Sequence, residues 1–318
     1  MQILDNVLDA IGDTPLVRLS NYHPAGNLVV KLEFMNPGGS VKERIAVSMI
    51  DAAEKAGLLK PGGTIIEPTS GNTGAGLALI GAVRGYRVIC TVPDKVSREK
   101  QDLLRAYGVE VIETPTALLP DHPDSYYGVA RRLTAEIEGA YNPDQYTNAQ
   151  NPAAHYATTG PEIWLQTDGT VGAVVAGVGT GGTCTGIGRY LKEQNPEILI
   201  VGADPQGSIY SALRPEDIHQ YQVEGVGEDF WPETIDTSVI DSFIMVTDQE
   251  SFTAARHLAR QEGILTGGSG GMALHAAVQV AETHPDRLVV VVIPDSGKGY
   301  LSRIFNDEWL EANGFIAD

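Results

Sequence analysis

The feature that most constrains the fold is a regular alternation of short β-branched runs with longer segments of helical periodicity. The β-branched runs are LVVKLE near 28, TIIE near 64, RVICTV near 87, VEVIET near 109, AVVAGV, ILIVGAD, SFIMV and LVVVVI. Between them, VKERIAVSMIDAAEKAG and ESFTAARHLARQEG carry apolar residues at helical spacing and end in Gly, a common helix stop. This order predicts an α/β protein with mostly parallel sheets flanked by helices.

Two irregular stretches interrupt the alternation. TPTALLPDHPDSYYG is rich in Pro and Asp, and DQYTNAQNPAAH shows few regular signals, so both are expected to be loop-like. A chain of 318 residues, 42% of them hydrophobic, is long enough for two domains with their own cores. We place the domain junction near residues 145–150.

Charge and cysteine content exclude several classes of protein. The chain has 22 basic and 41 acidic residues, a net charge of −19, which disfavours binding to nucleic acid or to an anionic membrane surface. Cys90 and Cys184 cannot form a disulfide framework, and the start of the chain lacks a basic and apolar leader, so a cytoplasmic protein is expected. The histidines show no HExxH pattern, and no catalytic metal is expected.

A first candidate site is NPGGSVKERIA, residues 36–46. Ser40 and Glu43 have the spacing of a capping box, which predicts a helix beginning there with Lys42 in its first turn. The positive end of the helix dipole disfavours a protonated amine, so the pKa of Lys42 should be lowered, which suits Schiff-base chemistry. An ordinary solvated helix lysine is the alternative interpretation.

A second candidate is EPTSGNTGAG, residues 67–76. Thr69, Ser70, Asn72 and Thr73 cluster where a strand is expected to end and a helix to begin. Hydroxyls, an amide and free backbone N–H groups at a helix start bind a carboxylate or a phosphate. Helix capping alone would use fewer such groups.

A third candidate is the glycine-rich segment AVVAGVGTGGTCTG. Gly177, Gly179 and Gly182 have the spacing of a dinucleotide fingerprint, and Asp204 lies about where an acidic residue would meet a ribose. A nicotinamide-dependent dehydrogenase is therefore an alternative. The hydroxyls within residues 180–183 favour a terminal phosphate monoester instead.

Two further segments lie near the end of the chain. In LTGGSGGMALHAAV, glycine pairs flank Ser269, whose hydroxyl could donate to a ring nitrogen of a flat ligand. In VVIPDSGKGY, a strand ends on Pro294, Asp295 and Ser296, and loops at the carboxyl ends of parallel strands commonly line ligand sites.

Together and in this order, over nearly the whole chain, these segments resemble the cysteine synthase and cystathionine β-synthase family of pyridoxal-phosphate enzymes. The resemblance implies the tryptophan-synthase-β-like fold, known as fold type II. It also implies a larger cofactor-binding domain, residues 1–40 plus 150–318, and a smaller mobile domain, residues 41–149, that clamps the substrate.

The resemblance further implies roles for single residues around pyridoxal 5'-phosphate. Lys42 would form the internal aldimine, Asn72 would meet the ring hydroxyl and Ser269 the ring nitrogen. The residues implied for the cofactor phosphate are Gly179, Thr180, Gly181, Gly182 and Thr183; those implied for the substrate are Thr69, Ser70, Asn72, Thr73, Gln145 and Gly225.

Within the family, DQYTNAQNPAAHYATT, PDSYYGVARRL, ADPQGSIY and EGVGEDF resemble the cystathionine β-synthases most. These enzymes join L-serine and L-homocysteine into L-cystathionine and water through an aminoacrylate. The alternative is a cysteine synthase, which converts O-acetylserine and sulfide to cysteine and acetate. Glu228 stands where animal cystathionine β-synthases have a tyrosine, and this departure bears on the second substrate.

The resemblance also suggests assembly and control. A homodimer is expected, and a contact with the tail of serine acetyltransferase, which some cysteine synthases bind, is a further expectation. Because the chain begins close to IGDTPLVRL and stops soon after the last expected core helix, neither haem nor adenosylmethionine control is expected. A non-catalytic binding relative would be expected to lack Lys42.

Overall fold

The structure is a computed structural model that describes residues 3–69, 71–94, 96, 98–115, 118 and 122–317. The chain folds into two compact units. Unit 1 comprises residues 1–11 and 36–151, and unit 2 comprises residues 12–35 and 152–318. Among the described residues, none of the helices combines the length and the apolar character needed to cross a membrane.

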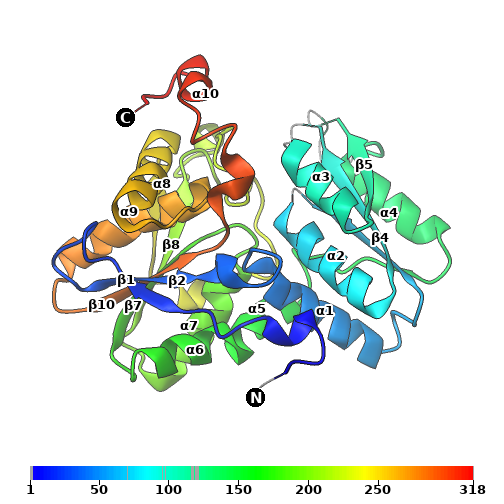
Figure 1. Cartoon of the computed structure of the whole chain (residues 1–318), viewed down its shortest axis with the longest axis horizontal. Helices are drawn as coiled ribbons and strands as arrows, with labels where there is room; N and C mark the ends of the chain where they lie inside the picture. The colour runs from blue at the N-terminus through cyan, green and yellow to red at the C-terminus, as the bar shows by residue number, and fades with distance from the viewer. Residues whose placement is uncertain are drawn as a thin grey trace. The chain divides into compact units, whose positions relative to one another are not determined.

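Unit 1 is built on a parallel 4-stranded sheet with the order β5-β4-β3-β6 (Figure 1). Its strands are β3 (Thr64–Pro68), β4 (Arg87–Pro93), β5 (Glu110–Thr114) and β6 (Ala140–Tyr141), and its helices are α1 (Lys42–Lys55), α2 (Asn72–Arg84), α3 (Arg98–Ala106) and α4 (Tyr126–Glu136). One face packs against α1, α2 and α3 through residues such as Ile50, Leu77 and Leu104. The other face packs against Ala130 of α4.

Unit 2 is built on a 6-stranded sheet with the order β1-β2-β10-β7-β8-β9, parallel except for β1 (Figure 1). Its strands are β1 (Leu16–Arg18), β2 (Leu28–Leu32), β7 (Val171–Gly177), β8 (Leu199–Pro205), β9 (Ser242–Val246) and β10 (Leu288–Ile293). Helices α6 (Thr159–Gln166) and α7 (Gly182–Gln194) cover one face, and α8 (Asp248–Glu262) and α9 (Gly268–Thr283) cover the other. Because both faces are covered, a central strand such as β10 is apolar throughout.

The remaining elements are short. Helix α5 (Gln150–Ala157) spans the chain junction between the units, and α10 (Asp307–Ala312) lies near the C-terminus. The 3-10 helices are η1 (Val7–Ala10), η2 (Glu33–Met35), η3 (Pro215–Asp217), η4 (Thr237–Val239) and η5 (Gly297–Tyr300).

The eight β-branched runs all form strands, which confirms the predicted α/β class. The prediction that both irregular stretches are loop-like was wrong in part, because α4 begins at Tyr126 within the first stretch and α5 begins at Gln150 within the second. Side chains cap both starts: the Ser125 hydroxyl accepts a hydrogen bond from the Gly128 N–H at 3.0 Å, and Asn148 Oδ1 accepts one from the Gln150 N–H at 3.0 Å. These local caps outweigh the weak helical periodicity.

The observed unit boundaries differ from the expected domain boundaries at the N-terminal side. Residues 1–11 and 36–40 belong to unit 1, whereas the expectation placed residues 1–40 in the larger domain. Packing explains the difference, because Leu8 packs against the core of unit 1 and the Ser40 backbone bonds to Glu43 of α1. The junction after residue 151 lies next to the expected one.

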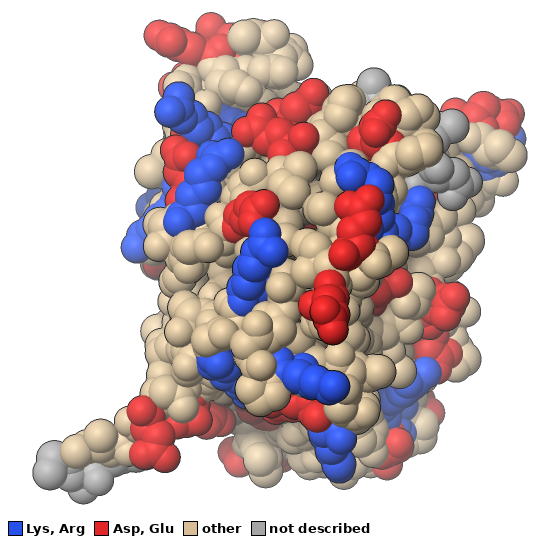
Figure 2. Space-filling view, turned by 90° about the vertical axis from the view of Figure 1, so that its right-hand side faces the viewer, with Lys and Arg blue, Asp and Glu red and all other residues tan. Residues whose placement is uncertain are grey.

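Charge on the face that Figure 2 views is mixed rather than segregated. Figure 2 shows basic and acidic side chains interspersed over the face that it views. The net charge of −19 is therefore not accompanied by a continuous basic surface on that face, as a nucleic-acid-binding face would require.

Candidate active site

Lys42 is the first residue of α1 and is half-buried. The Ser40 hydroxyl accepts a hydrogen bond from the Lys42 N–H at 3.2 Å. The buried Glu43 carboxylate accepts from the N–H groups of Ser40 and Gly38, each at 2.8 Å. The glutamate half of the predicted capping box is thus present. The Ser40 hydroxyl, however, bonds to the N–H of Lys42 rather than to the N–H of Glu43. The helix begins where the sequence predicted, with Lys42 in its first turn.

The Lys42 end of α1 packs against the second turn of α2. A Cβ atom on Gly76 would lie 3.2 Å from the Lys42 carbonyl oxygen and 3.1 Å from the Cβ of Ala46. A side chain there would require the neighbouring atoms to move by a few tenths of an ångström, so glycine favours the close approach of the two helices. Two candidate segments, one around Lys42 and one at the start of α2, therefore lie side by side in unit 1.

The start of α2 gathers the predicted carboxylate-binding residues. Gly71 caps the helix with a φ of 152°, and the Thr69 hydroxyl accepts from the N–H groups of Gly71 at 3.2 Å and Gly74 at 3.3 Å. The Thr73 hydroxyl donates to Gln145 Oε1 at 2.7 Å. Asn72 opens the helix and is half-buried. Ser70 lies outside the described residues.

Sequence reasoning did not single out Glu67, which lies directly beneath this cluster. It is fully buried in β3, and its carboxylate accepts hydrogen bonds from the Asp144 N–H at 3.0 Å, the Gln145 N–H at 3.2 Å and Asn142 Nδ2 at 3.3 Å. Burial raises the pKa of Glu67 to about 8, although the backbone hydrogen bonds from Gln145 and Asp144 oppose the shift. A single charged residue within the apolar run TIIE was the available signal.

In unit 2, Gly179–Thr183 connects β7 to α7. The loop is held through its carbonyl groups: the Tyr210 hydroxyl donates to the Gly179 oxygen at 2.5 Å, and the Thr234 hydroxyl donates to the Thr180 oxygen at 2.6 Å. Gly181 has a φ of 78°, and a Cβ there would overlap Ile235. The first N–H groups of an α-helix have no acceptor within the helix, so this end of α7 offers donors to an anion.

A buried histidine, also missed by sequence reasoning, supports this loop. His155 Nε2 lies 3.3 Å from the Thr183 hydroxyl, and its Nδ1 lies 2.9 Å from the Thr159 hydroxyl. His155 therefore fixes the position of the Thr183 side chain. The loop combines backbone donors, two hydroxyl groups and the positive end of a helix, which fits the dianionic phosphate of pyridoxal phosphate.

Ser269 lies in the first turn of α9 and is buried. The flanking glycines allow close packing rather than flexibility. A Cβ on Gly267 would lie 2.6 Å from Asp295 Oδ1, and a Cβ on Gly270 or Gly271 would overlap the Thr266 side chain or the Ser251 carbonyl group. The backbone around Ser269 is therefore fixed.

The predicted site residues of unit 2 gather near the carboxyl end of β7. A Cβ on Gly177 would lie 2.9 Å from the Val226 side chain and 3.7 Å from the backbone carbonyl oxygen of Ser269. A Cβ on Gly179 would lie 3.1 Å from the Gly225 oxygen. Each unit thus brings its own predicted site residues together.

Asp204, the residue on which the dehydrogenase alternative depended, is engaged elsewhere. It is buried at the end of β8, and Oδ2 accepts from the Ser211 hydroxyl at 2.6 Å and the Ser211 N–H at 2.8 Å. Burial raises its pKa, and hydrogen bonds from Ser211 and Ser208 oppose that shift. A carboxylate held inside the fold is poorly placed to bind a ribose hydroxyl.

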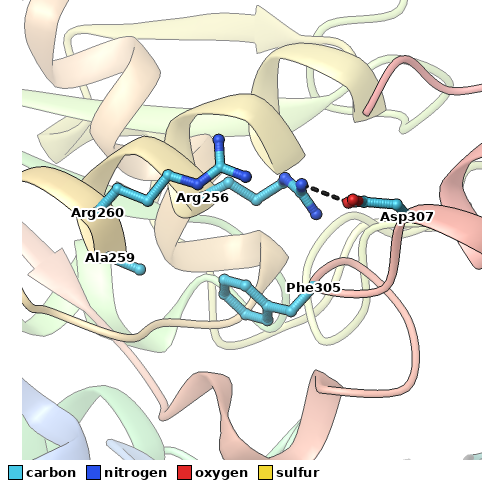
Figure 3. Close-up of a pocket in the computed structure, with 5 residues that line it drawn as sticks. All are labelled: Arg256, Ala259, Arg260, Phe305 and Asp307. Carbon is cyan, nitrogen blue, oxygen red and sulfur yellow. Dashed lines mark hydrogen bonds and ion pairs between the residues drawn. The ribbon is translucent and has the colours of Figure 1, made fainter. Parts of the chain in front are cut away.

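A separate surface pocket of about 240 Å³ lies between α8 and the C-terminal segment of unit 2 (Figure 3). Arg256, Ala259, Arg260, Phe305 and Asp307 line it. The Arg256 guanidinium donates a hydrogen bond to the Asp307 carboxylate at 2.6 Å and one to the Ile304 carbonyl oxygen at 3.1 Å. The bond to Asp307 connects α8 to α10. No predicted site residue is among the residues that line this pocket.

The chain is similar to known enzymes over most of its length. Residues 7–295 match the family described as pyridoxal-phosphate dependent enzymes. The chain is 49% identical to cystathionine beta-synthase of Oryctolagus cuniculus and 49% identical to that of Saccharomyces cerevisiae, covering 100% and 98% of this chain respectively. It spans only 59% and 65% of the length of those two relatives.

A solved structure is also similar. The crystal structure of a hydrogen sulfide-producing enzyme from Fusobacterium nucleatum superposes with a TM-score of 0.89 at 38% identity, covering 94% of this chain and 100% of that one. This similarity confirms the predicted fold type. The chain belongs to the family of pyridoxal-phosphate dependent enzymes.

Proposed function

We propose that the protein replaces the β-hydroxyl group of L-serine with the thiol of L-homocysteine, which gives L-cystathionine and water. The observation that carries this proposal is the arrangement in unit 1, where Thr73 bonds to Gln145 at the start of α2 and Lys42 opens the adjacent helix. The 49% identity to enzymes named cystathionine beta-synthase supports the choice of substrates.

Pyridoxal phosphate, when bound, withdraws electrons from the substrate α-carbon, so that the α-proton becomes acidic and a group on the β-carbon can leave. Residues of this chain hold the reactants and move the proton. Thr69, Asn72 and Gln145 would bind the substrate carboxylate with side-chain donors, and Thr73 would contribute through the backbone N–H groups at the positive end of α2, because its hydroxyl donates to Gln145. Lys42, the proposed covalent attachment residue, would take the α-proton once its amine is released.

Residues of unit 2 would hold the cofactor and set its electronic character. The loop Gly179–Thr183 would bind the phosphate, and the Ser269 hydroxyl would bond to the ring nitrogen. A neutral hydroxyl cannot balance a positive charge on that nitrogen, so Ser269 would leave the bound ring largely unprotonated. Such a ring favours loss of a β-group over prolonged carbanion chemistry.

A cysteine synthase remains a second candidate, because Glu228 is a specific departure from the animal cystathionine β-synthases. Glu228 is half-buried; its N–H donates to the Ser208 hydroxyl at 3.1 Å, and its carbonyl group accepts from the Ile209 N–H at 2.9 Å. Burial is the main reason that the pKa values of Tyr210 and Tyr221 are raised, and the nearby charge of Glu228 raises them further. A carboxylate near a thiol-binding region would disfavour a second substrate that carries a carboxylate of its own.

The visible absorption spectrum separates the two candidates. L-serine alone is expected to change the spectrum of the purified holoenzyme, and subsequent L-homocysteine to restore it with release of cystathionine, measured by mass spectrometry. A protein that responds only to O-acetylserine, and then makes cysteine from sulfide, would be a cysteine synthase. Absence of any response to both amino acids would contradict β-replacement.

The dehydrogenase alternative has its own test. NAD or NADP is expected to leave the thermal unfolding temperature unchanged, because Asp204 is bonded to Ser211 within the fold. A concentration-dependent rise in that temperature would support nicotinamide binding. A homodimer and a contact with the tail of serine acetyltransferase stay predictions, to be tested by light scattering and co-purification.

A further inference from the structure

An ionisable carboxylate lies in the apolar interior of unit 1. Glu67 has 0% exposure, as do its strand neighbours Ile65 and Ile66. It pairs in register with Cys90 on β4, on the face that α1 and α2 cover. Burial of a carboxylate is costly, so its presence here is best explained by the hydrogen bonds that it accepts.

Those hydrogen bonds lead to the residues that are proposed to bind the substrate. Glu67 Oε1 accepts from the Gln145 N–H at 3.2 Å, and Oε2 accepts from the Asp144 N–H at 3.0 Å. The Gln145 side chain in turn accepts from Thr73 at 2.7 Å, and its carbonyl group accepts from Asn151 at 2.8 Å. Gln145 is thus held at its N–H, its carbonyl group and its side chain.

The same loop contains a backbone conformation that needs support. Asp144 has a φ of 49°, in the left-handed region, which a residue other than glycine adopts at an energetic cost. The Glu67 carboxylate accepts hydrogen bonds from the N–H groups of Asp144 and Gln145. Without the acceptor, the loop would lose the contacts that hold the Asp144 turn.

We propose that Glu67 is a positioning residue that holds Gln145, and through it Thr73, in the geometry that binds the substrate carboxylate. Glu67 acts through Gln145 and does not itself touch substrate. This inference rests on the proposed function, because it assumes that Gln145 and Thr73 bind the carboxylate of the amino acid.

A pH dependence follows from the state of this carboxyl group. Its pKa is raised to about 8, chiefly by burial, so the group is neutral at lower pH and ionised at higher pH. The charged or titratable groups that interact with it are Asp144, Cys90 and Tyr141. In the first turn of α1, which packs on α2, the charged residues are Lys42, Glu43 and Arg44.

The sign of the effect comes from the donors around Glu67. The ionised group can accept all three hydrogen bonds, whereas the neutral group turns one oxygen into a donor that faces N–H groups. The loop is therefore held best in the ionised state. The KM for L-serine is expected to fall as pH rises through about 8.

The test compares the wild-type holoenzyme with Glu67→Gln, which keeps the shape of the side chain and cannot ionise. We measure kcat and KM for L-serine from about pH 6.5 to about pH 9.5. The KM of the variant is expected to be about tenfold higher at the alkaline end, with a smaller change in kcat. The wild-type step near pH 8 should be absent in the variant.

Glu54→Gln is the matched control, since Glu54 is a carboxylate of the same unit that is only partly buried and is bonded to Tyr86 and Arg84. It should leave KM and its pH profile unchanged. If Glu67 acts through Gln145, Glu67→Gln should add little to the effect of Gln145→Ala. Additive effects, or a step near pH 8 that persists in Glu67→Gln, would overturn the proposal.

Hydrogen exchange tests the positioning role without any substrate. After correction for the intrinsic pH dependence of exchange, the amides of Asp144 and Gln145 should become more protected above pH 8 in the wild type only. If these amides respond but L-serine has no effect on the enzyme, the proposed function fails and the structural link stands. If the amides do not respond, Glu67 does not hold this loop.

Discussion

Replacement of Lys42 by Ala is expected to reduce turnover by at least about 10³-fold and to remove the covalent bond between the protein and the cofactor. The residue supplies the only amine assigned both to that bond and to the transfer of the α-proton. The fold should persist, because alanine is a strong helix former at the start of α1. Borohydride reduction followed by peptide mass spectrometry measures the bond, and circular dichroism measures the fold.

Lys55→Ala is the matched control, because Lys55 ends the same helix and its side chain is exposed. It should leave both the bond and turnover unchanged. A Lys42→Ala protein that still carried covalently attached cofactor would show that another amine has this role.

The second large effect is expected from Gly181→Ala in the proposed phosphate loop. A Cβ at this position would overlap Ile235, and the φ of 78° strains any side chain. The loop must shift to relieve the overlap, so the phosphate donors are displaced. We expect cofactor affinity to fall by at least about tenfold and the unfolding free energy to fall by about 2–3 kcal/mol. Equilibrium dialysis of the cofactor and denaturant unfolding measure the two quantities.

Gly263→Ala separates backbone strain from overlap. Gly263 ends α8 with a φ of 70°, and nothing lies within 4 Å of a Cβ built there. Its replacement should cost only the backbone strain, about 1 kcal/mol, and leave cofactor affinity unchanged. Equal effects from the two variants would mean that contact with Ile235 does not determine the loop position.

Sequence patterns predicted the strands well because buried parallel strands need long β-branched runs, as in LVVVVI of β10. They missed β1, whose pattern is mostly exposed, and β6, which has only 2 residues. Helix α5 was also missed, because its start depends on a cap from Asn148 rather than on apolar periodicity.

The proposed site shows a similar division. Glycine-rich and hydroxyl-rich segments such as Gly179–Thr183 could be identified because binding an anion on the backbone demands those residue types. Glu67 and His155 could not be assigned in advance, because their partners lie 78 and 28 residues away in the chain. Only the tertiary structure brings Glu67 to the Gln145 N–H and His155 to the Thr183 hydroxyl.

The order in which the chain builds its two units has a consequence for synthesis. Strand β2 ends at Leu32, but its neighbour β10 ends at Ile293, so the larger sheet cannot close until the residues up to Ile293 have left the ribosome. The smaller unit is complete once residue 151 has emerged. Unit 1 can therefore fold first during translation. Until β10 is made, the apolar side chains of the β1–β2 segment stay exposed to solvent. Slow translation beyond residue 151 would prolong that exposure and favour aggregation.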